Sequence, residues 1–190
     1  FDAYGSVYTT AQIEFDSDIA AKVPAELPQK EHYTTLGWST VQGDTVAITD
    51  FGTMPANAVA YYPVYERVTV KLVPVEGSTT MIERFVGGSA VVESYNDGYT
   101  VSTEFVATTD STKNLIYGLK VNQRDTVLKS TYVEVQGDGY AVVTPVAKGR
   151  LGTGTLVEVY DNADTSAPVE TLYVVIFGDV DGNGLTGHRG

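Results

Sequence analysis

Short runs of valine, threonine and tyrosine, separated by glycine, asparagine and aspartate, recur along the chain and restrict its fold more than any other feature. β-Branched and aromatic residues favour strands, and glycine-containing dipeptides favour tight turns. Almost no run shows the apolar spacing of an amphipathic helix. With 190 residues, 43% of them hydrophobic, the chain is long enough to bury a core. We therefore predict a mainly β protein, an α+β chain with very little helix.

The uneven distribution of aromatic residues indicates that the chain forms more than one domain. Ten of its twenty aromatic residues precede residue 66, so we expect the first third to have its own core. Residues 59–75 indicate two strands that meet near Glu66 and Arg67, where a valine-rich alternation replaces the aromatics. We predict a first domain over 1–65, a second over 66–178, and a separate tail over 179–190. Further strands are expected at 7–15, 20–23 and 33–39.

Turn signals indicate that the second domain is an antiparallel, β-sandwich-like structure. Asn96-Asp97-Gly98 predicts a hairpin between 90–95 and 99–107, and Gly137-Asp138-Gly139 predicts another between 131–136 and 140–144. Residues 122–130 are the one expected helix, with Asn122 as its cap. Residues 172–177 are apolar throughout, which predicts a central strand covered on both faces.

The formal net charge of −12 excludes several partners. An acidic chain repels nucleic acid and anionic lipid, and no apolar run is long enough for a transmembrane helix, so we expect neither nucleic-acid binding nor membrane insertion. Cysteine is absent, which rules out disulfides and zinc–thiolate sites. A cytosolic protein can lack cysteine by chance, but secreted proteins of Gram-positive bacteria often do without it, so its absence leans toward an extracellular location. No stretch has the pattern of a signal peptide, so we expect a mature fragment or an excised piece.

The only tryptophan, Trp38, has two opposite interpretations: a ring exposed for stacking on a sugar, or a side chain packed in a core. Its surroundings resemble the internalin B-type (Listeria–Bacteroides) repeat of bacterial surface proteins over residues 1–65. The matching segments are Pro28-Gln29-Lys30-Glu31-His32-Tyr33, Gly37-Trp38-Ser39 and Met54-Pro55-Ala56-Asn57, followed by Val59 and Tyr62. The resemblance implies a small β-grasp-like unit in which the Gly-Trp pair belongs to the packing. It therefore favours a core position for Trp38.

Two residues depart from the repeat pattern. His32 stands where the family has glycine, at a position where a positive φ is expected and where histidine is tolerated. We expect it to be a turn residue rather than a base or a metal ligand. Thr35 replaces an aromatic residue, so we expect a thinner core there.

Residues 179–185 have the pattern of a calcium loop. Asp179, Asp181 and Asn183 alternate at positions 1, 3 and 5, Gly184 occupies position 6, and the Leu185 carbonyl falls at position 7. The candidate metal ligands are Asp179, Asp181, Asn183 and Leu185. Position 12, which should close the site with a carboxylate, is Gly190, so we expect calcium to bind weakly. The alternative is a glycine- and aspartate-rich turn without a metal.

The phrase Gly178-Asp179-Val180-Asp181-Gly182-Asn183-Gly184 looks like the opening of a dockerin. That family binds calcium in two such loops and binds cohesin through them. Only half of one loop is present here, so we do not expect cohesin binding. The preceding segments at 115–119, 135–145, 149–161 and 169–184 are similar to β-rich modules that lie before dockerin-like segments in surface proteins of gut Gram-positive bacteria.

Groups suited to catalysis are scarce. His32 and His188 are the only histidines, which argues against a serine nucleophile with a histidine base. The 24 acidic residues supply many carboxylate pairs, but nothing in the sequence indicates a cleft around any of them. The Gly152–Thr155 run lacks the Lys-Ser or Lys-Thr of a phosphate loop. We predict that the chain is not an enzyme and has no catalytic residues.

The expected function is therefore that of a non-catalytic extracellular structural or adhesion module, a spacer or protein-contact unit of a larger bacterial surface protein. Its partners would be other proteins or neighbouring repeats of the same polypeptide. The alternative is a carbohydrate-binding module of a dockerin-bearing, polysaccharide-active protein, with Tyr61 and Tyr62, or Tyr95 and Tyr99, as stacking rings. Lys71, isolated in an apolar strand, is either outward-facing or the lysine of an internal isopeptide bond to asparagine.

Overall fold

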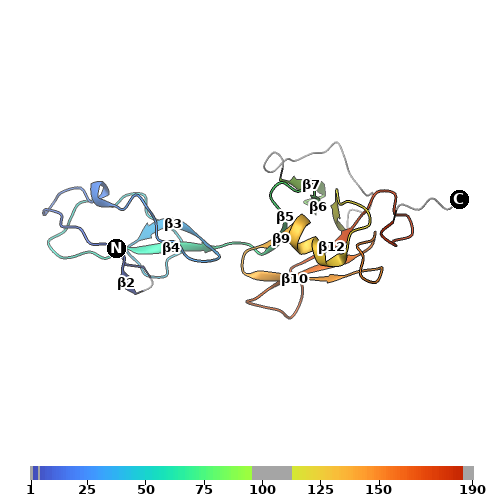
Figure 1. The fold of residues 1–190 in the computed structure, drawn as a ribbon. Coiled ribbons are helices and arrows are strands. Elements are labelled where there is room, and N and C mark those ends of the chain that lie inside the picture. The colour runs from blue at the N-terminus through green and yellow to red at the C-terminus, as the bar shows by residue number, and fades with distance from the viewer. Residues whose placement is uncertain (1, 4, 96–112, 186–190) are drawn as a thin grey trace. The chain divides into compact units, whose positions relative to one another are not determined.

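The computed structural model describes residues 2–3, 5–95 and 113–185. The chain divides into two compact units, Phe1–Val68 and Thr69–Gly190, whereas the sequence-based boundary lies between residues 65 and 66. Strands form most of the regular structure in both units, and the helices of the described residues are short (Figure 1). The prediction of a mainly β fold is confirmed.

The first unit contains two antiparallel strand pairs in its described part. The short strands β1 (Asp2–Ala3) and β2 (Ser6–Val7) pair with each other, and β3 (Tyr33–Ser39) pairs with β4 (Tyr62–Arg67). The strand predicted over 33–39 is thus confirmed. The register of β3 against β4 shifts between Thr35 and Gly37, which marks an irregularity of the β-bulge type just before Trp38.

The strands predicted over 7–15 and 20–23 are wrong. In the first region only the end of β2 is a strand, and residues 20–22 form the 3₁₀ helix η1 (Ala20–Lys22). The Asp18 carboxylate accepts the N–H of Ala20 at 2.9 Å, and the N–H of Lys22 donates to the carbonyl of Ile19. Such local hydrogen bonds compete with strand pairing.

The larger sheet of the second unit has the strand order β10-β11-β12-β8-β6-β7 among the described residues. Neighbouring strands run antiparallel, except that β12 and β8 are parallel. The strands are β6 (Met81–Val86), β7 (Ser89–Ser94), β8 (Asn114–Tyr117), β10 (Gly139–Thr144), β11 (Leu156–Asp161) and β12 (Glu170–Val174).

The central position predicted for the last apolar run is confirmed, because β12 lies between β11 and β8. Its alternate side chains reach two different apolar clusters: Leu172 and Val174 belong to the main core, and Tyr173 packs on the opposite side against Leu115 and Tyr117. Period-two alternation in a sheet covered on both faces produces this arrangement.

A smaller antiparallel pair, β5 (Lys71–Pro74) with β9 (Val133–Gln136), contributes to the same core. Leu72 of β5 and Val133 of β9 are fully buried, and they join one cluster with Ile82 and Ile116 of the larger sheet. The core of the second unit therefore contains apolar side chains from both sheets.

The hairpin predicted across Gly137-Asp138-Gly139 is wrong. The turn exists, but β9 pairs with β5 and β10 pairs with β11, so the chain passes from one sheet to the other at this turn. A turn signal fixes a change of direction and does not fix which strands become neighbours. The hairpin expected at Asn96-Asp97-Gly98 lies outside the described residues.

The helix predicted over 122–130 is displaced along the chain. A 3₁₀ turn, η2 (Asp125–Val127), continues into a π-helical turn, η3 (Leu128–Tyr132), which buries Leu128 and Tyr132. Asn122 is not the cap: its φ is +59°, in the left-handed region, and its side-chain oxygen accepts a hydrogen bond from Arg150 at 2.8 Å. No helix of the described residues combines the length and apolar character needed to cross a membrane.

Candidate functional site

Trp38 lies in the core of the first unit. Only 2% of the residue is exposed, and it forms one buried cluster with Ile19 and Tyr61. The ring of Tyr8 lies 5.9 Å from the Trp38 ring, between centroids. A Cβ on the preceding Gly37 would stand 2.9 Å from the Cβ of Ala47, so glycine permits the close packing at this point. The core position predicted for Trp38 is confirmed, and its ring offers no open face for a ligand.

His32 is a turn residue, as predicted. Its φ is +62°, and the turn is closed by a hydrogen bond from the Tyr33 N–H to the Lys30 carbonyl. Its Nε2 lies 3.4 Å from a carboxylate oxygen of the neighbouring Glu31, whose side chain is 88% exposed. Nothing in this arrangement indicates a base or a metal site.

The structure brings the four predicted calcium ligands into one turn. Asp179 is 3% exposed, and its Oδ2 accepts the N–H groups of Thr153 at 2.8 Å and Gly184 at 3.1 Å. Its other oxygen, Oδ1, is buried and has no hydrogen-bond partner among the described residues. A buried carboxylate oxygen without a partner is costly, and a cation would satisfy it.

The remaining predicted ligands are joined by short bonds within the turn. Asn183 donates its side-chain N–H to Asp181 at 2.8 Å, and the Leu185 N–H donates to the side-chain oxygen of Asn183 at 2.8 Å. Asp181 is exposed. Within the part of the chain that the structure describes, no group of three or more His, Cys, Asp or Glu side chains is placed to hold a metal ion. A calcium ion here would therefore depend on amide and carbonyl oxygens besides the two carboxylates.

This loop belongs to the second unit and is packed against the Gly152–Thr155 turn. A Cβ on Gly152 would collide with the Gly182 carbonyl, and the Gly184 carbonyl accepts the Asn122 N–H at 2.8 Å. Close approach of two backbones explains the Gly-Thr-Gly-Thr run without a phosphate. The sequence did not reveal this contact, because its two halves are about 30 positions apart along the chain.

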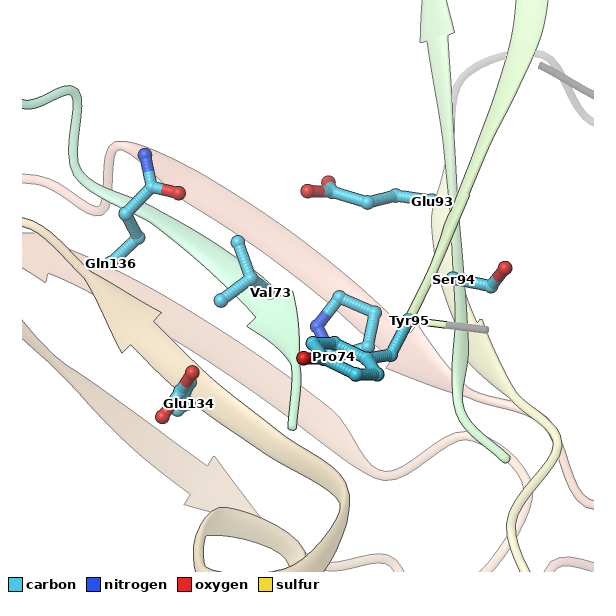
Figure 2. A pocket seen from close by; sticks show the side chains of 7 residues that line it. All are labelled: Val73, Pro74, Glu93, Ser94, Tyr95, Glu134 and Gln136. Carbon is cyan, nitrogen blue, oxygen red and sulfur yellow. The ribbon is translucent and has the colours of Figure 1, made fainter. Parts of the chain in front are cut away.

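A cavity of about 380 Å³, which the sequence did not reveal, lies in the second unit (Figure 2). Its lining comes from β5, from β9 and from the end of β7, and comprises Val73, Pro74, Glu93, Ser94, Tyr95, Glu134 and Gln136. We call it the Tyr95 cavity. In the sequence, Glu134 and Gln136 alternate with apolar residues, which predicts that their side chains lie on the outward face of a strand. That pattern does not show which other strands border this face, so it could not reveal the cavity.

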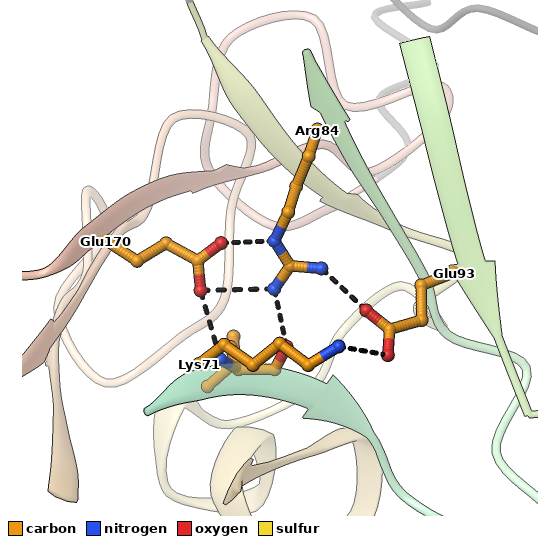
Figure 3. A network of polar contacts seen from close by, with 5 residues as sticks. Lys71, Arg84, Glu93 and Glu170 are labelled. Carbon is orange, nitrogen blue, oxygen red and sulfur yellow. Dashed lines mark hydrogen bonds and ion pairs between the residues drawn. The ribbon is translucent and has the colours of Figure 1, made fainter. Parts of the chain in front are cut away.

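Next to this cavity, four charged side chains form a network (Figure 3). Lys71 Nζ lies 3.0 Å from Glu93 Oε1, and Arg84 Nη1 lies 2.7 Å from Glu93 Oε2. Arg84 also binds both oxygens of Glu170 through Nε and Nη2. Lys71 is thus paired with a carboxylate rather than outward-facing, and this ion pair gives no support to the isopeptide interpretation.

The network fixes the backbone of β5. The Leu72 N–H donates to Glu170 Oε2 at 3.0 Å, and the Leu72 carbonyl accepts a hydrogen bond from Arg84 Nη2. The Arg84–Glu170 pair therefore satisfies both backbone polar groups of Leu72, as a neighbouring strand would.

Comparisons of the chain with protein-family models, with curated proteins and with solved structures find no match.

Proposed function

We propose that this chain is a non-catalytic structural or adhesion module of an extracellular bacterial surface protein, acting as a spacer or protein-contact unit. The observation that carries the proposal concerns the two motifs that suggested ligand binding, the tryptophan segment and the calcium-type loop: both take part in packing. Trp38 is sealed in a core, and the Asp179 loop is bonded to the Thr153 turn. The resemblance of residues 1–65 to surface-protein repeats supports an extracellular location.

Affinity gel electrophoresis with soluble plant and host polysaccharides, together with a reducing-sugar assay on the same polymers, tests this proposal. A spacer or protein-contact unit should migrate unchanged in every gel and release no sugar. Retardation in any polysaccharide gel, or release of reducing ends, would contradict it.

The alternative, a carbohydrate-binding module, is favoured by one observation on the second unit. Tyr140 of β10 and Tyr160 of β11 are direct cross-strand neighbours whose rings lie 5.3 Å apart at an interplanar angle of 13°, and Tyr140 is 41% exposed. Tyr61, by contrast, is 5% exposed and donates its hydroxyl hydrogen to the Phe51 carbonyl, so it is no stacking ring. Retardation that disappears in Tyr140→Ala would support this alternative.

We further propose that the Asp179 loop binds calcium weakly as a structural ion. Asp179 Oδ1 lacks a partner among the described residues, and Asp181 and Asn183 place further oxygens in the same turn. A ligand that binds only the folded state stabilises it, so calcium at millimolar concentration should raise the unfolding temperature of the second unit. Asp181→Asn should abolish the increase and Asp164→Asn should preserve it. Identical unfolding with calcium and with a chelator would contradict the proposal.

A further inference from the structure

The Tyr95 cavity combines an apolar floor with an aromatic wall. Val73 and Pro74 of β5 supply aliphatic surface, and Tyr95, which follows β7, supplies a ring that is 43% exposed. Its volume of about 380 Å³ is at the lower end for sites that bind small groups. Such a site suits a flexible alkyl chain with one polar end.

The charges around the cavity do not balance. Lys71 is paired with Glu93, and Arg84 with both Glu93 and Glu170, so the charges of these four groups sum to zero. Glu134 remains: it is exposed, and its side chain makes no hydrogen bond or ion pair within the described residues. Glu76 adds a second negative charge, because its carboxylate accepts the Tyr95 hydroxyl hydrogen, a bond that raises the pKa of Tyr95.

The geometry points to a protonated lysine side chain of a partner protein as the occupant of the Tyr95 cavity. Its methylene groups would lie on Val73 and Pro74, and its ammonium would meet the Glu134 carboxylate and the Tyr95 ring. An anionic group would be repelled by Glu134 and Glu76, and a neutral sugar would leave both charges without a counterion. This inference rests on the proposed protein-contact function and names the chemistry of the partner.

Nuclear magnetic resonance titration of the full chain with N-acetyl-lysine methylamide tests the inference. The matched neutral probe is N-acetyl-norleucine methylamide, which lacks only the ammonium. We expect amide shifts at Ser94, Tyr95, Glu134 and Gln136, with a dissociation constant in roughly the millimolar range, and no such shifts with the neutral probe.

Glu134→Gln should weaken lysine binding by about threefold to tenfold, because one charge-assisted contact is lost. Glu66→Gln is the matched control, since Glu66 is an exposed strand glutamate of β4 in the first unit, and it should leave binding unchanged. Both positions are exposed, so both variants should keep the amide spectrum of the parent.

Three results would overturn the inference: no shift at the cavity, equal shifts with the two probes, or equal weakening by the two substitutions. Any of these, with unchanged migration in polysaccharide gels, removes the lysine site and leaves the proposed function standing. Polysaccharide retardation that is lost in Tyr95→Ala would remove both.

Discussion

At the scale of single residues, Gly37 decides whether Trp38 can enter its core. Its φ of +145° is a backbone conformation that side chains with a Cβ rarely adopt, and a Cβ there would also press on Ala47 at 2.9 Å. We expect Gly37→Ala to lower the free energy of unfolding of the first unit by about 2–4 kcal/mol, from backbone strain and overpacking together. Urea denaturation followed by Trp38 fluorescence measures the change.

Gly43 provides the control for this substitution. It also has a positive φ, +80°, but a Cβ there would meet nothing within 4 Å. Gly43→Ala should therefore lower the free energy of unfolding only through backbone strain, by about 1 kcal/mol. Equal costs for the two substitutions would show that contact with Ala47 contributes nothing.

Tyr117 makes the stability of the second unit depend on pH in alkaline solution. Burial, followed by the charge and hydrogen bond of Glu83, raises the pKa of Tyr117 to about 12. Because the unfolded tyrosine loses its proton near pH 10, the native state binds more protons between these values. The stabilising contribution is complete below about pH 10 and is lost as the pH rises toward about 12.

Urea unfolding of the second unit between about pH 9 and about pH 11 checks this expectation. The stability of the parent should fall across that range, and Tyr117→Phe should show a shallower fall. Tyr95 and Tyr160, whose pKa values are also raised, should leave a residual slope. Parallel slopes for parent and variant would exclude Tyr117 as the main titrating group.

At the scale of elements, β5 depends on side chains for part of its hydrogen bonding. Arg84 and Glu170 bond the Leu72 peptide, and the Glu170 side chain is only 8% exposed. Glu170→Ala would remove the acceptor of the Leu72 N–H and of Arg84 Nε, and it would leave Arg84 bonded only to Glu93 and the Leu72 carbonyl. We expect it to lower the free energy of unfolding of the second unit by about 3–5 kcal/mol, the usual cost of breaking a buried pair.

Thermal or urea unfolding monitored by far-ultraviolet circular dichroism measures that cost. Glu134→Gln is the control, because this exposed glutamate has no bonded partner within the described residues, and it should change stability by less than about 0.5 kcal/mol. If Glu170→Ala were as stable as this control, the hydrogen bonds of Arg84 and Glu170 to Leu72 would not be needed to keep β5 in place.

Elements formed by local pattern were predictable, and their partners were not. The strand-forming run at 33–39, bounded by turn residues, predicted β3, and the run of successive apolar residues at 172–177 predicted the central position of β12. The pairing of β9 with β5, and of Lys71 with Glu93, joins residues 22 or more positions apart. Pattern specifies which face of a strand is apolar; long-range packing decides which strand lies beside it. For the same reason the Tyr95 cavity, assembled from three strands, escaped prediction.

At the scale of the whole molecule, the chain has separate apolar clusters in its two units. The buried cluster around Trp38 includes only residues before Glu66, and the main cluster of the second unit begins at Val70. The sequence suggested this division through the distribution of aromatic residues. A domain with its own core can unfold as its own cooperative unit. We therefore expect two unfolding transitions for the full chain.

Trp38 makes the two transitions separable, since it is the only tryptophan and lies in the first unit. Leu172, which is fully buried in the second unit, is the position to perturb. Leu172→Ala should lower the stability of that unit by about 3–5 kcal/mol through loss of packing and formation of a cavity. The circular dichroism transition of the second unit should then move to lower urea concentration while the fluorescence transition of Trp38 stays in place. A matching shift of the Trp38 transition would mean that the two cores unfold as one, and the chain would have to be treated as a single cooperative domain.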